Sequence, residues 1–348
     1  MSRQVLIVKT SSLGDVVHAL PAAAEASAHG YVLDWVVEEA FADLPRLLPG
    51  VRHVIPVAWR RWRRQLRASA GEMKTFRDQI QAVDYDLVLD SQGLLKSAAI
   101  ALCARGPRAG YSHTSAREPW AAFAYQQRHR ILRGQHAIDR QRQLFAAALG
   151  YPLAAQPVWV ASQTAPVAEQ ATTDQILLMH GTTWATKHWP EPMWIALAQM
   201  IRQQGYRPCV TWGDETERAR AQNIATASGA EVLDKMPIQQ LVQVLLQSRL
   251  VIGVDSGLVH LSAGLGIPTL ALYGPTDARL TGARGPRAYS VSADLPCAPC
   301  VRPQCTAYRG DPLIWQAQPV EPPCFAASTP ALVWQRAQQL LGSPAESA

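Results

Sequence analysis

The stretch VLIVKTSSLGDVVHALPAAAEASA, residues 5–28, sets the fold class of this chain. Its first four residues form an uninterrupted apolar run, which predicts a short strand buried on both faces. Residues 10–14 are polar and predict a turn, and residues 15–28 have the composition of a helix. A buried strand that leads through a polar turn into a helix is the repeating unit of a parallel α/β sheet.

Short apolar runs and helical segments continue to alternate along the rest of the chain. In the first half, strands are predicted at residues 32–37, 53–57 and 87–89, and helices at 73–83 and 94–104. In the second half, strands are predicted at 176–179, 208–212, 250–254 and 269–272, with helices at 191–204 and from about 215. Both halves therefore predict a parallel sheet covered by helices.

The segment between these halves has a different composition. It holds Pro152, Pro157 and Pro166 among Ala, Gln, Ser and Thr, which does not sustain a helix. We predict a first domain at residues 1–150, a linker at 151–174 and a second domain at 175–348; the length of 348 residues suits two domains. The predicted fold class is α/β, with two doubly wound, Rossmann-like domains facing a cleft in which ligands bind.

Charge is divided unevenly between the two predicted domains. Residues 1–150 contain 20 basic and 13 acidic side chains, whereas residues 151–348 contain 13 and 14. A cationic domain suits an anionic partner, such as a nucleic acid, an acidic membrane surface or a phosphorylated substrate. The first eight residues hold too few apolar side chains for a signal peptide or a membrane span, so we expect a cytosolic protein without a disulfide framework.

Polar residues follow the first strand, from Lys9 to Asp15, where backbone N–H groups of the next helix attract anions. The spacing is neither a P-loop nor GxGxxG. Two interpretations stay open for Asp15: it caps the helix, or it acts as a general base toward a bound alcohol.

Two further motifs occupy corresponding places in the second half. Residues 180–190 follow the first strand there and offer two Thr hydroxyls and Lys187 to a diphosphate, or else form a polar loop packed by tryptophans. Residues 254–260 place Asp, Ser and Gly at a strand end, with His260 one turn into the helix. The spacing misses the G-x-S-x-G elbow by one residue, which favours phosphate or sugar contact over a hydrolase triad.

Three other clusters of charged or cysteine residues are less specific indicators of function. A run of five arginines between residues 60 and 67 predicts either a solvated helical face or recognition of phosphates and carboxylates, and no nucleic-acid motif accompanies it. Asp84 and Asp86 flank Tyr85 at a strand start and are not interpreted as a metal site. The cysteine spacing resembles an incomplete metal knuckle; whether it binds metal is left open for Cys297, Cys300, Cys305 and Cys324.

Taken in order, the blocks KTSSLGDVVHALPA, DLVLDSQGLLKSA, TTWATKHWP and VDSGLVHLSAGLGIPTLALYGPTD resemble the bacterial lipopolysaccharide heptosyltransferases, most closely those of type I. The resemblance spans about residues 4–282. It implies the two-domain GT-B architecture and transfer of L-glycero-D-manno-heptose from ADP-heptose to the Kdo residue of a Kdo-lipid A precursor. It also implies an acceptor-binding first domain and a donor-binding second domain, with neither metal nor cofactor.

The resemblance places the catalytic base at Asp15. It implies donor-binding roles for Lys9, Ser11, Ser12, Thr182, Thr183, Lys187, Glu217, Asp255, Ser256, Gly257 and His260. It implies acceptor-binding roles for Arg60, Arg61, Arg63, Arg64 and Arg117. The cysteine-containing tail departs from the type I pattern and is similar to other members of the wider family.

The expected mechanism is an inverting displacement in which Asp15 removes a proton from the acceptor hydroxyl and ADP leaves without a bound cation. The lipid acceptor implies peripheral contact with the cytosolic face of the inner membrane, and no nucleic-acid partner is expected. The alternatives are another heptosyltransferase with a heptose acceptor, a nucleotide-sugar epimerase or hydrolase, and a non-catalytic binder of nucleotide or glycolipid.

Overall fold

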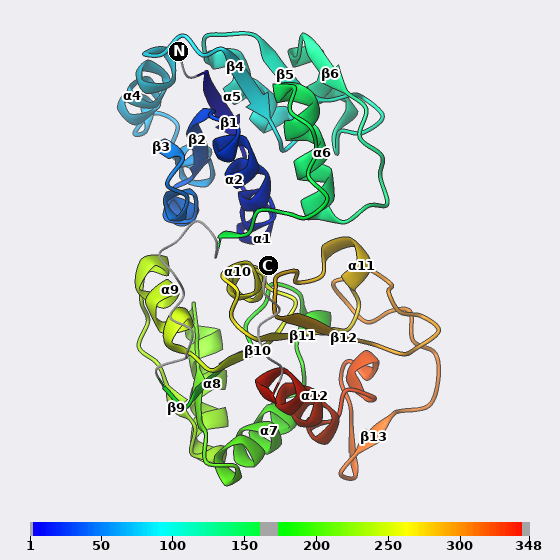
Figure 1. The fold of residues 1–348 in the computed structure, drawn as a ribbon. Coiled ribbons are helices and arrows are strands. Elements are labelled where there is room, and N and C mark those ends of the chain that lie inside the picture. The colour runs from blue at the N-terminus through cyan, green and yellow to red at the C-terminus, as the bar shows by residue number, and fades with distance from the viewer. Residues whose placement is uncertain (1–2, 161–172, 343–348) are drawn as a thin grey trace. The chain divides into compact units, whose positions relative to one another are not determined.

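The computed structural model describes residues 3–160 and 173–342 of the chain. It divides into two compact units, Met1–Ala165 and Pro166–Ala348, each built around one six-stranded parallel sheet (Figure 1). The predicted α/β class with two doubly wound sheets is therefore confirmed.

The sheet of the first unit has the strand order β3-β2-β1-β4-β5-β6, in which all neighbours are parallel. This is the doubly wound order of Rossmann-like sheets. The strands are β1 (Gln4–Val8), β2 (Val32–Glu38), β3 (Val51–Val57), β4 (Leu87–Asp90), β5 (Arg108–Tyr111) and β6 (Gln127–His129). Helices cover both faces of the sheet, so β4 and nearly all of β1 are buried, as their apolar runs predict.

The helix predicted at residues 15–28 is broken into two. Residues Leu13–Val17 form α1 and Leu20–Ala28 form α2, because Pro21 has no N–H to continue the hydrogen-bond ladder of α1. The arginine-rich helix is also shorter than predicted, with α3 limited to Trp59–Trp62. The remaining helices are α4 (Ala70–Gln81), α5 (Leu95–Cys103) and α6 (Ala137–Leu149), and the short 3-10 segments are η1 (Glu39–Phe41), η2 (Pro45–Leu47) and η3 (Pro119–Ala124).

The second unit repeats the same topology. Its strand order β12-β11-β10-β7-β8-β9 matches that of the first sheet when its strands are counted from β7. The strands are β7 (Gln175–Met179), β8 (Arg207–Val210), β9 (Glu231–Val232), β10 (Leu250–Val254), β11 (Thr269–Tyr273) and β12 (Ala288–Ser292). The helices are α7 (Glu191–Gln203), α8 (Glu215–Ser228), α9 (Ile238–Gln247), α10 (Gly257–Gly264), α11 (Ala278–Thr281) and α12 (Pro330–Gly342), with 3-10 turns η5 (Ala185–Lys187) and η6 (Pro323–Phe325).

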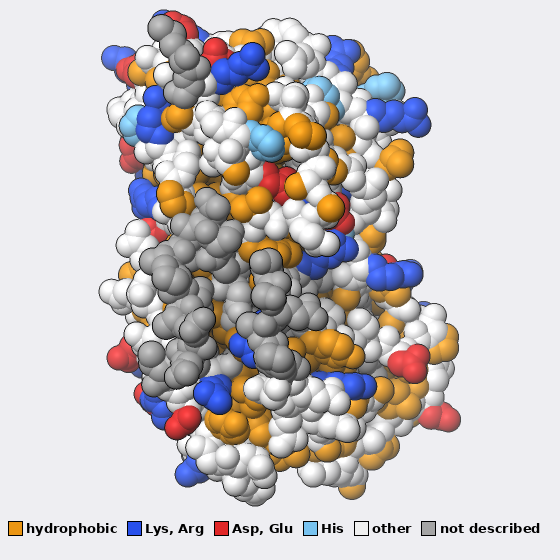
Figure 2. All heavy atoms as spheres, in the orientation of Figure 1, with side chains coloured by type: hydrophobic (Ala, Val, Ile, Leu, Met, Phe, Trp, Pro, Cys, Tyr) orange, Lys and Arg blue, Asp and Glu red, His pale blue; other side chains and the backbone are white. Residues whose placement is uncertain are grey.

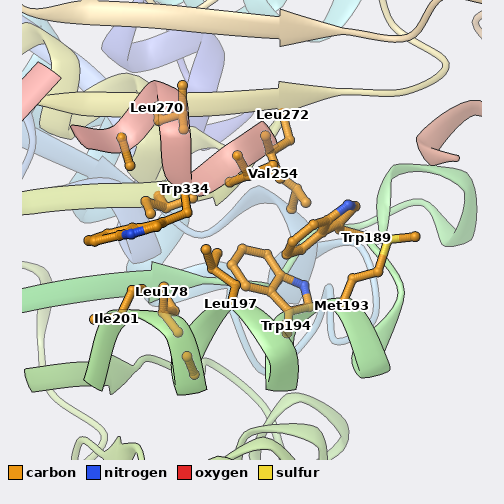
Figure 3. Packing of buried hydrophobic residues seen from close by; sticks show 14 of the residues in the cluster. Leu178, Trp189, Met193, Trp194, Leu197, Ile201, Val254, Leu270, Leu272 and Trp334 are labelled. Carbon is orange, nitrogen blue, oxygen red and sulfur yellow. The ribbon is translucent and has the colours of Figure 1, made fainter. Parts of the chain in front are cut away.

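The core of the second unit lies between its sheet and the helices α7 and α12. Trp189 and Trp194 pack edge to face with ring centroids 4.9 Å apart, and Trp334 of α12 lies across the same cluster (Figure 3). Between β12 and α12 the chain is mostly irregular, apart from η6 and the two-residue strands β13 (Ile314–Trp315) and β14 (Gln318–Pro319). The C-terminal helix is thus an integral part of this core.

The predicted linker, residues 151–174, lies partly outside the described residues, which leave out 161–172. Residues 151–160 pack on the first unit: Tyr151 and Val160 are buried, and the carbonyls of Ala154 and Gln156 accept hydrogen bonds from Arg142. Across residues 3–160 and 173–342, none of the helices has the length and apolar character needed to cross a bilayer.

Candidate active site

The candidate site residues follow the central strands of each sheet. In the first unit the strand order reverses between β1 and β4, and in the second between β7 and β10. Open α/β sheets bind ligands beyond the carboxyl ends of such strands. The segments that begin at Lys9, His180 and Asp255 all start directly after one of these four strands. The topology therefore supports the choice of motifs made from the sequence.

Asp15 is held at the start of α1 by one of its two carboxylate oxygens. Its Oδ2 accepts hydrogen bonds from the backbone N of Ser12 at 2.9 Å and from Ser12 Oγ at 3.0 Å. Asp15 therefore does cap the helix, as one interpretation predicts. Within the described residues its Oδ1 accepts no hydrogen bond, so that oxygen can still accept one from a substrate.

Lys9 and Ser12 favour the ionised form of Asp15. Burial raises the pKa of Asp15, but the nearby Lys9 ammonium and the hydrogen bonds from Ser12 outweigh burial, so the pKa lies below its usual value. Lys9 is 4% exposed, and burial lowers its pKa against the opposing effect of Asp15 and Asp90. Asp15 is consequently ionised at neutral pH, as a proton acceptor must be.

Two residues after β4 fix this loop; they lie in the block DLVLDSQGLLKSA, but no role was predicted for them in the donor, acceptor or base set. Gln92 Oε1 accepts from Thr10 N at 2.7 Å, and Gln92 Nε2 donates to the Ser11 carbonyl at 2.9 Å. Lys96 Nζ donates to Ser11 Oγ at 2.7 Å. The signal that could have found Gln92 and Lys96 is their position directly beyond the second central strand.

The predicted acceptor arginines are all exposed, but their contacts differ. Arg117 lies near enough to Asp15 to lower its pKa. Arg61 is paired with Glu39 and Glu72 at 3.1 and 2.9 Å. On the face of the molecule drawn in Figure 2, Lys and Arg side chains are scattered and acidic side chains lie among them, so this face carries no continuous basic patch.

The second unit holds a triplet of interacting side chains around the buried Asp255. Lys187 Nζ lies 2.7 Å from Asp255 Oδ2, and His260 Nε2 lies 3.1 Å from Oδ1. Burial raises the pKa of Asp255, but the His260 hydrogen bond and the Lys187 charge outweigh it and lower the pKa well below its usual value. Thr276 Oγ1 donates to Asp255 Oδ2 at 2.7 Å. Asp255 therefore fixes the Lys187 ammonium at the edge of the sheet.

Of the other predicted donor residues, Lys9, Ser11 and Ser12 lie in the first unit, and Thr182, Thr183, Ser256 and Gly257 lie on the segments that carry this triplet. Thr182 Oγ1 donates to the backbone carbonyl of Asp255 at 3.0 Å, whereas Thr183 is exposed. Ser256 is the N-cap of α10, and its side chain makes no capping hydrogen bond, which leaves the hydroxyl beside the N–H groups of the first turn. Gly257 is the first residue of α10.

Glu217 lies at the neighbouring strand end, after β8. Its Oε2 accepts a hydrogen bond from Gly213 N at 2.7 Å, and burial raises its pKa. A Cβ added to Gly181 would lie 2.3 Å from Glu217 Oε1, so this carboxylate packs directly over the backbone that follows β7. A side chain at position 181 would therefore displace the Glu217 carboxylate from this position.

The remaining residues considered as a metal site are the acidic pair around Tyr85 and the four cysteines of the second unit. Asp86 Oδ2 accepts a hydrogen bond from Gln4 N at 2.7 Å, and Asp84 lies 4.0 Å from Arg105. Cys297, Cys300, Cys305 and Cys324 are free thiols, and burial and the other three cysteines raise the pKa of Cys324 to about 12. Among the described residues, no His, Cys, Asp and Glu side chains form a group of three or more arranged to hold a metal ion.

The fold and these strand-end clusters define a class of sugar-transferring enzyme, and comparison with known proteins identifies it. The family model "Glycosyltransferase family 9 (heptosyltransferase)" matches residues 73–309. The chain belongs to this family. Its activity is heptosyl transfer in the synthesis of the lipopolysaccharide core.

Individual relatives agree with this assignment. The chain is 42% identical over 353 aligned residues to lipopolysaccharide heptosyltransferase 1 of Pseudomonas aeruginosa, covering 98% of this chain and 99% of that protein. It is 41% identical to the Escherichia coli enzyme of the same name, covering 81% and 91%. The solved E. coli heptosyltransferase WaaC with ADP superposes with a TM-score of 0.78 at 40% identity, covering 82% of this chain and 92% of that one. The GT-B architecture is thereby shown.

Proposed function

We propose that this heptosyltransferase transfers L-glycero-D-manno-heptose from ADP-heptose to the Kdo residue of a Kdo-lipid A precursor. Four curated relatives at 40–42% identity are named lipopolysaccharide heptosyltransferase 1. The two relatives named heptosyltransferase 2 match over only 27% of this chain. This contrast favours the type I acceptor over a heptose acceptor.

The second unit is proposed to bind the donor. E. coli WaaC was solved with ADP and with ADP-2-deoxy-2-fluoro heptose, and these structures are 39–40% identical to this chain. Lys187, Thr182, Thr183 and the N-terminus of α10 offer a cation, hydroxyls and N–H groups to the diphosphate. Glu217 is proposed to accept hydrogen bonds from ribose hydroxyls. The proposed donor set also includes Asp255, Ser256, Gly257 and His260, together with Lys9, Ser11 and Ser12.

The chemical step is proposed to be an inverting displacement with Asp15 as base. Asp15 Oδ1 takes the proton of the acceptor hydroxyl while that oxygen forms a bond to the anomeric carbon of heptose. The bond from that carbon to the ADP oxygen breaks, and ADP leaves with the electron pair. Lys187, the two Thr hydroxyls and the N–H groups at helix N-termini stabilise the growing charge on the diphosphate. Oδ1, which accepts no hydrogen bond from the described residues, is the observation that carries this assignment.

The first unit is proposed to bind the acceptor. Residues 1–165 carry 20 basic and 13 acidic side chains. Arg60, Arg63, Arg64 and Arg117 are exposed and can contact Kdo carboxylates and lipid A phosphates, whereas Arg61 is held in two ion pairs. Such an acceptor places the enzyme in the cytoplasm, peripherally bound to the inner leaflet of the inner membrane.

The proposed acceptor is tested by following ADP release from ADP-heptose with purified protein. De-acylated Kdo-lipid A is expected to stimulate release strongly, while an acceptor already bearing heptose is not. ADP release that proceeds at the same rate without any acceptor would indicate hydrolysis instead. Stimulation only by the heptose-bearing acceptor would assign the enzyme to the other acceptor type.

A further inference from the structure

An apolar pocket in the first unit is lined by residues that are assigned above to neither catalysis nor substrate. It has a volume of about 370 Å³ and is lined from β3, α3, α4 and α5. Trp59, Trp62, Met73, Phe76 and Ile100 are among the apolar side chains that form its wall. A volume of this size lies within the range of ligand-binding pockets.

The wall of the pocket offers little to a polar ligand. Trp62 is 6% exposed and uses its Nε1 to donate to Glu72 Oε2 at 3.0 Å, so the ring is the part that it presents to its apolar neighbours. Phe76 packs edge to face on Trp62 with centroids 5.5 Å apart. The ligand that fits such a wall is a hydrocarbon chain, because it needs no hydrogen-bond partner.

Two cations also line the pocket, on the exposed side of α4. Lys74 and Arg77 are spaced three residues apart and therefore share a face of the helix. In the part of the chain that the structure describes, neither makes an ion pair or a side-chain hydrogen bond. An anionic head group attached to the hydrocarbon chain would form ion pairs with these two side chains.

The surface beside the pocket is apolar and basic as well. Met73 lines the pocket and is 37% exposed, and Leu66 and Leu102 are 62% and 55% exposed on the segments that flank it. Arg63, Arg64 and Arg67 lie on the segment that joins α3 to α4. Exposed apolar side chains between basic ones are suited to the interface of an anionic membrane.

We propose that this pocket binds the acyl chain of an anionic membrane lipid, with Lys74 and Arg77 holding its head group. Such a contact would fix the first unit at the membrane surface through residues other than those proposed to bind the acceptor sugar. None of the lining residues is assigned to donor, acceptor or base. Arg63 and Arg64 beside the pocket are also proposed acceptor contacts, so the test uses residues that line the pocket.

Cys103 provides the test, because this exposed thiol lines the pocket. The full-length protein is alkylated with N-ethylmaleimide, and peptide mass spectrometry gives the rate at Cys103 and at Cys305, an exposed thiol of the second unit. Dodecyl phosphate below its micellar concentration is expected to slow alkylation of Cys103 at least tenfold and to leave Cys305 unchanged. Inorganic phosphate should protect neither thiol.

Matched variants separate pocket binding from general effects. Ala99→Trp fills the pocket and should abolish protection, whereas Ala147→Trp, at an exposed position on α6, should preserve it. The double variant Lys74→Gln and Arg77→Gln should need at least tenfold more dodecyl phosphate. The proposal is overturned if Cys103 is not protected, if uncharged dodecyl maltoside protects it equally well, or if Ala99→Trp is protected like the wild type.

Discussion

Asp90 and Asp255 show how neighbouring groups decide the state of a carboxylate at the end of a strand. Asp90 ends β4 and Asp255 follows β10, which holds the equivalent place in the second sheet. Burial raises the pKa of Asp90, which accepts hydrogen bonds from Tyr125 and Ser97. Asp255 has Lys187 and His260 as partners, and its pKa is lowered. Asp90 therefore joins neighbouring segments of the first unit. Asp255 instead holds the Lys187 ammonium, which is proposed to bind the donor.

Lys187 is the residue through which this arrangement acts on the donor. Replacing it by Gln should lower kcat/KM for ADP-heptose by about 10- to 100-fold, because a charge-assisted contact is worth about 1.5 to 3 kcal/mol. The KM of the acceptor should not change. Lys235→Gln is the matched control, since both lysines lie over a tryptophan ring, at 4.8 Å for Lys187 and 5.6 Å for Lys235. Equal losses in the two variants would contradict the assignment.

His180 predicts a loss of stability in acid. Burial and the nearby Arg220 lower the pKa of this histidine to about 4 from 6.5. Between these values the unfolded state binds more protons, so the free energy of unfolding should fall by about 3 kcal/mol as pH drops from 6.5 to 4. Urea unfolding of His180→Gln should show a smaller fall, whereas His113→Gln, at an exposed position, should match the wild type. Parallel curves for wild type and His180→Gln would refute this.

Most inner strands of each sheet were predicted, as was the edge strand β3, whereas β5, β6, β9 and β12 were not. β1, β4, β7, β10 and β11 are covered on both faces, and their apolar runs are visible in the sequence. β6 has the sequence Gln-Arg-His, and β9 has only two residues, so no apolar run marks them. The regular spacing of apolar residues in Ile238–Gln247 did indicate α9, which the sequence analysis left out.

The two tryptophans that pack α7 on the sheet offer a comparison within one core. Trp189 Nε1 donates to the Ser328 carbonyl at 2.9 Å, whereas Trp194 Nε1 has no hydrogen-bond partner in the described part of the chain. Trp189→Phe should therefore lower the free energy of unfolding by about 1 to 3 kcal/mol more than Trp194→Phe. Both variants lose the same ring volume. Urea unfolding measures the difference, and equal losses would show that this hydrogen bond contributes nothing.

At the scale of the whole molecule, the sequence pattern selected candidate segments that the structure places at strand ends, but it did not show how these segments contact one another. The motifs after β1, β7 and β10 were found because they interrupt apolar runs. The contacts of Gln92 and Lys96 with Ser11 depend on the pairing of β1 with β4, which no local pattern shows. The pairing of Arg61 with Glu39 and Glu72, 22 and 11 residues away, likewise follows no local repeat in the sequence.

The excess charge of the first unit predicts salt-sensitive binding of the acceptor. The triple variant Arg60→Gln, Arg63→Gln and Arg64→Gln should raise the KM of de-acylated Kdo-lipid A at least tenfold, because several charge-assisted contacts are lost together. Arg61→Gln should have a much smaller effect, because its charge is already paired. Added salt should mimic the triple variant. An unchanged acceptor KM at equal stability would assign these arginines to a solvated surface.

The central claim is that Asp15 is the base for heptosyl transfer, and Asp15→Asn tests it most directly. The amide keeps the size of the carboxylate but cannot take the hydroxyl proton. We expect kcat for ADP release, measured with ADP-heptose and de-acylated Kdo-lipid A, to fall about 10² to 10⁴-fold. The Kd of ADP, measured by calorimetry, should stay unchanged. A variant that retains more than a tenth of the wild-type kcat would show that Asp15 only caps α1 and that the base lies elsewhere.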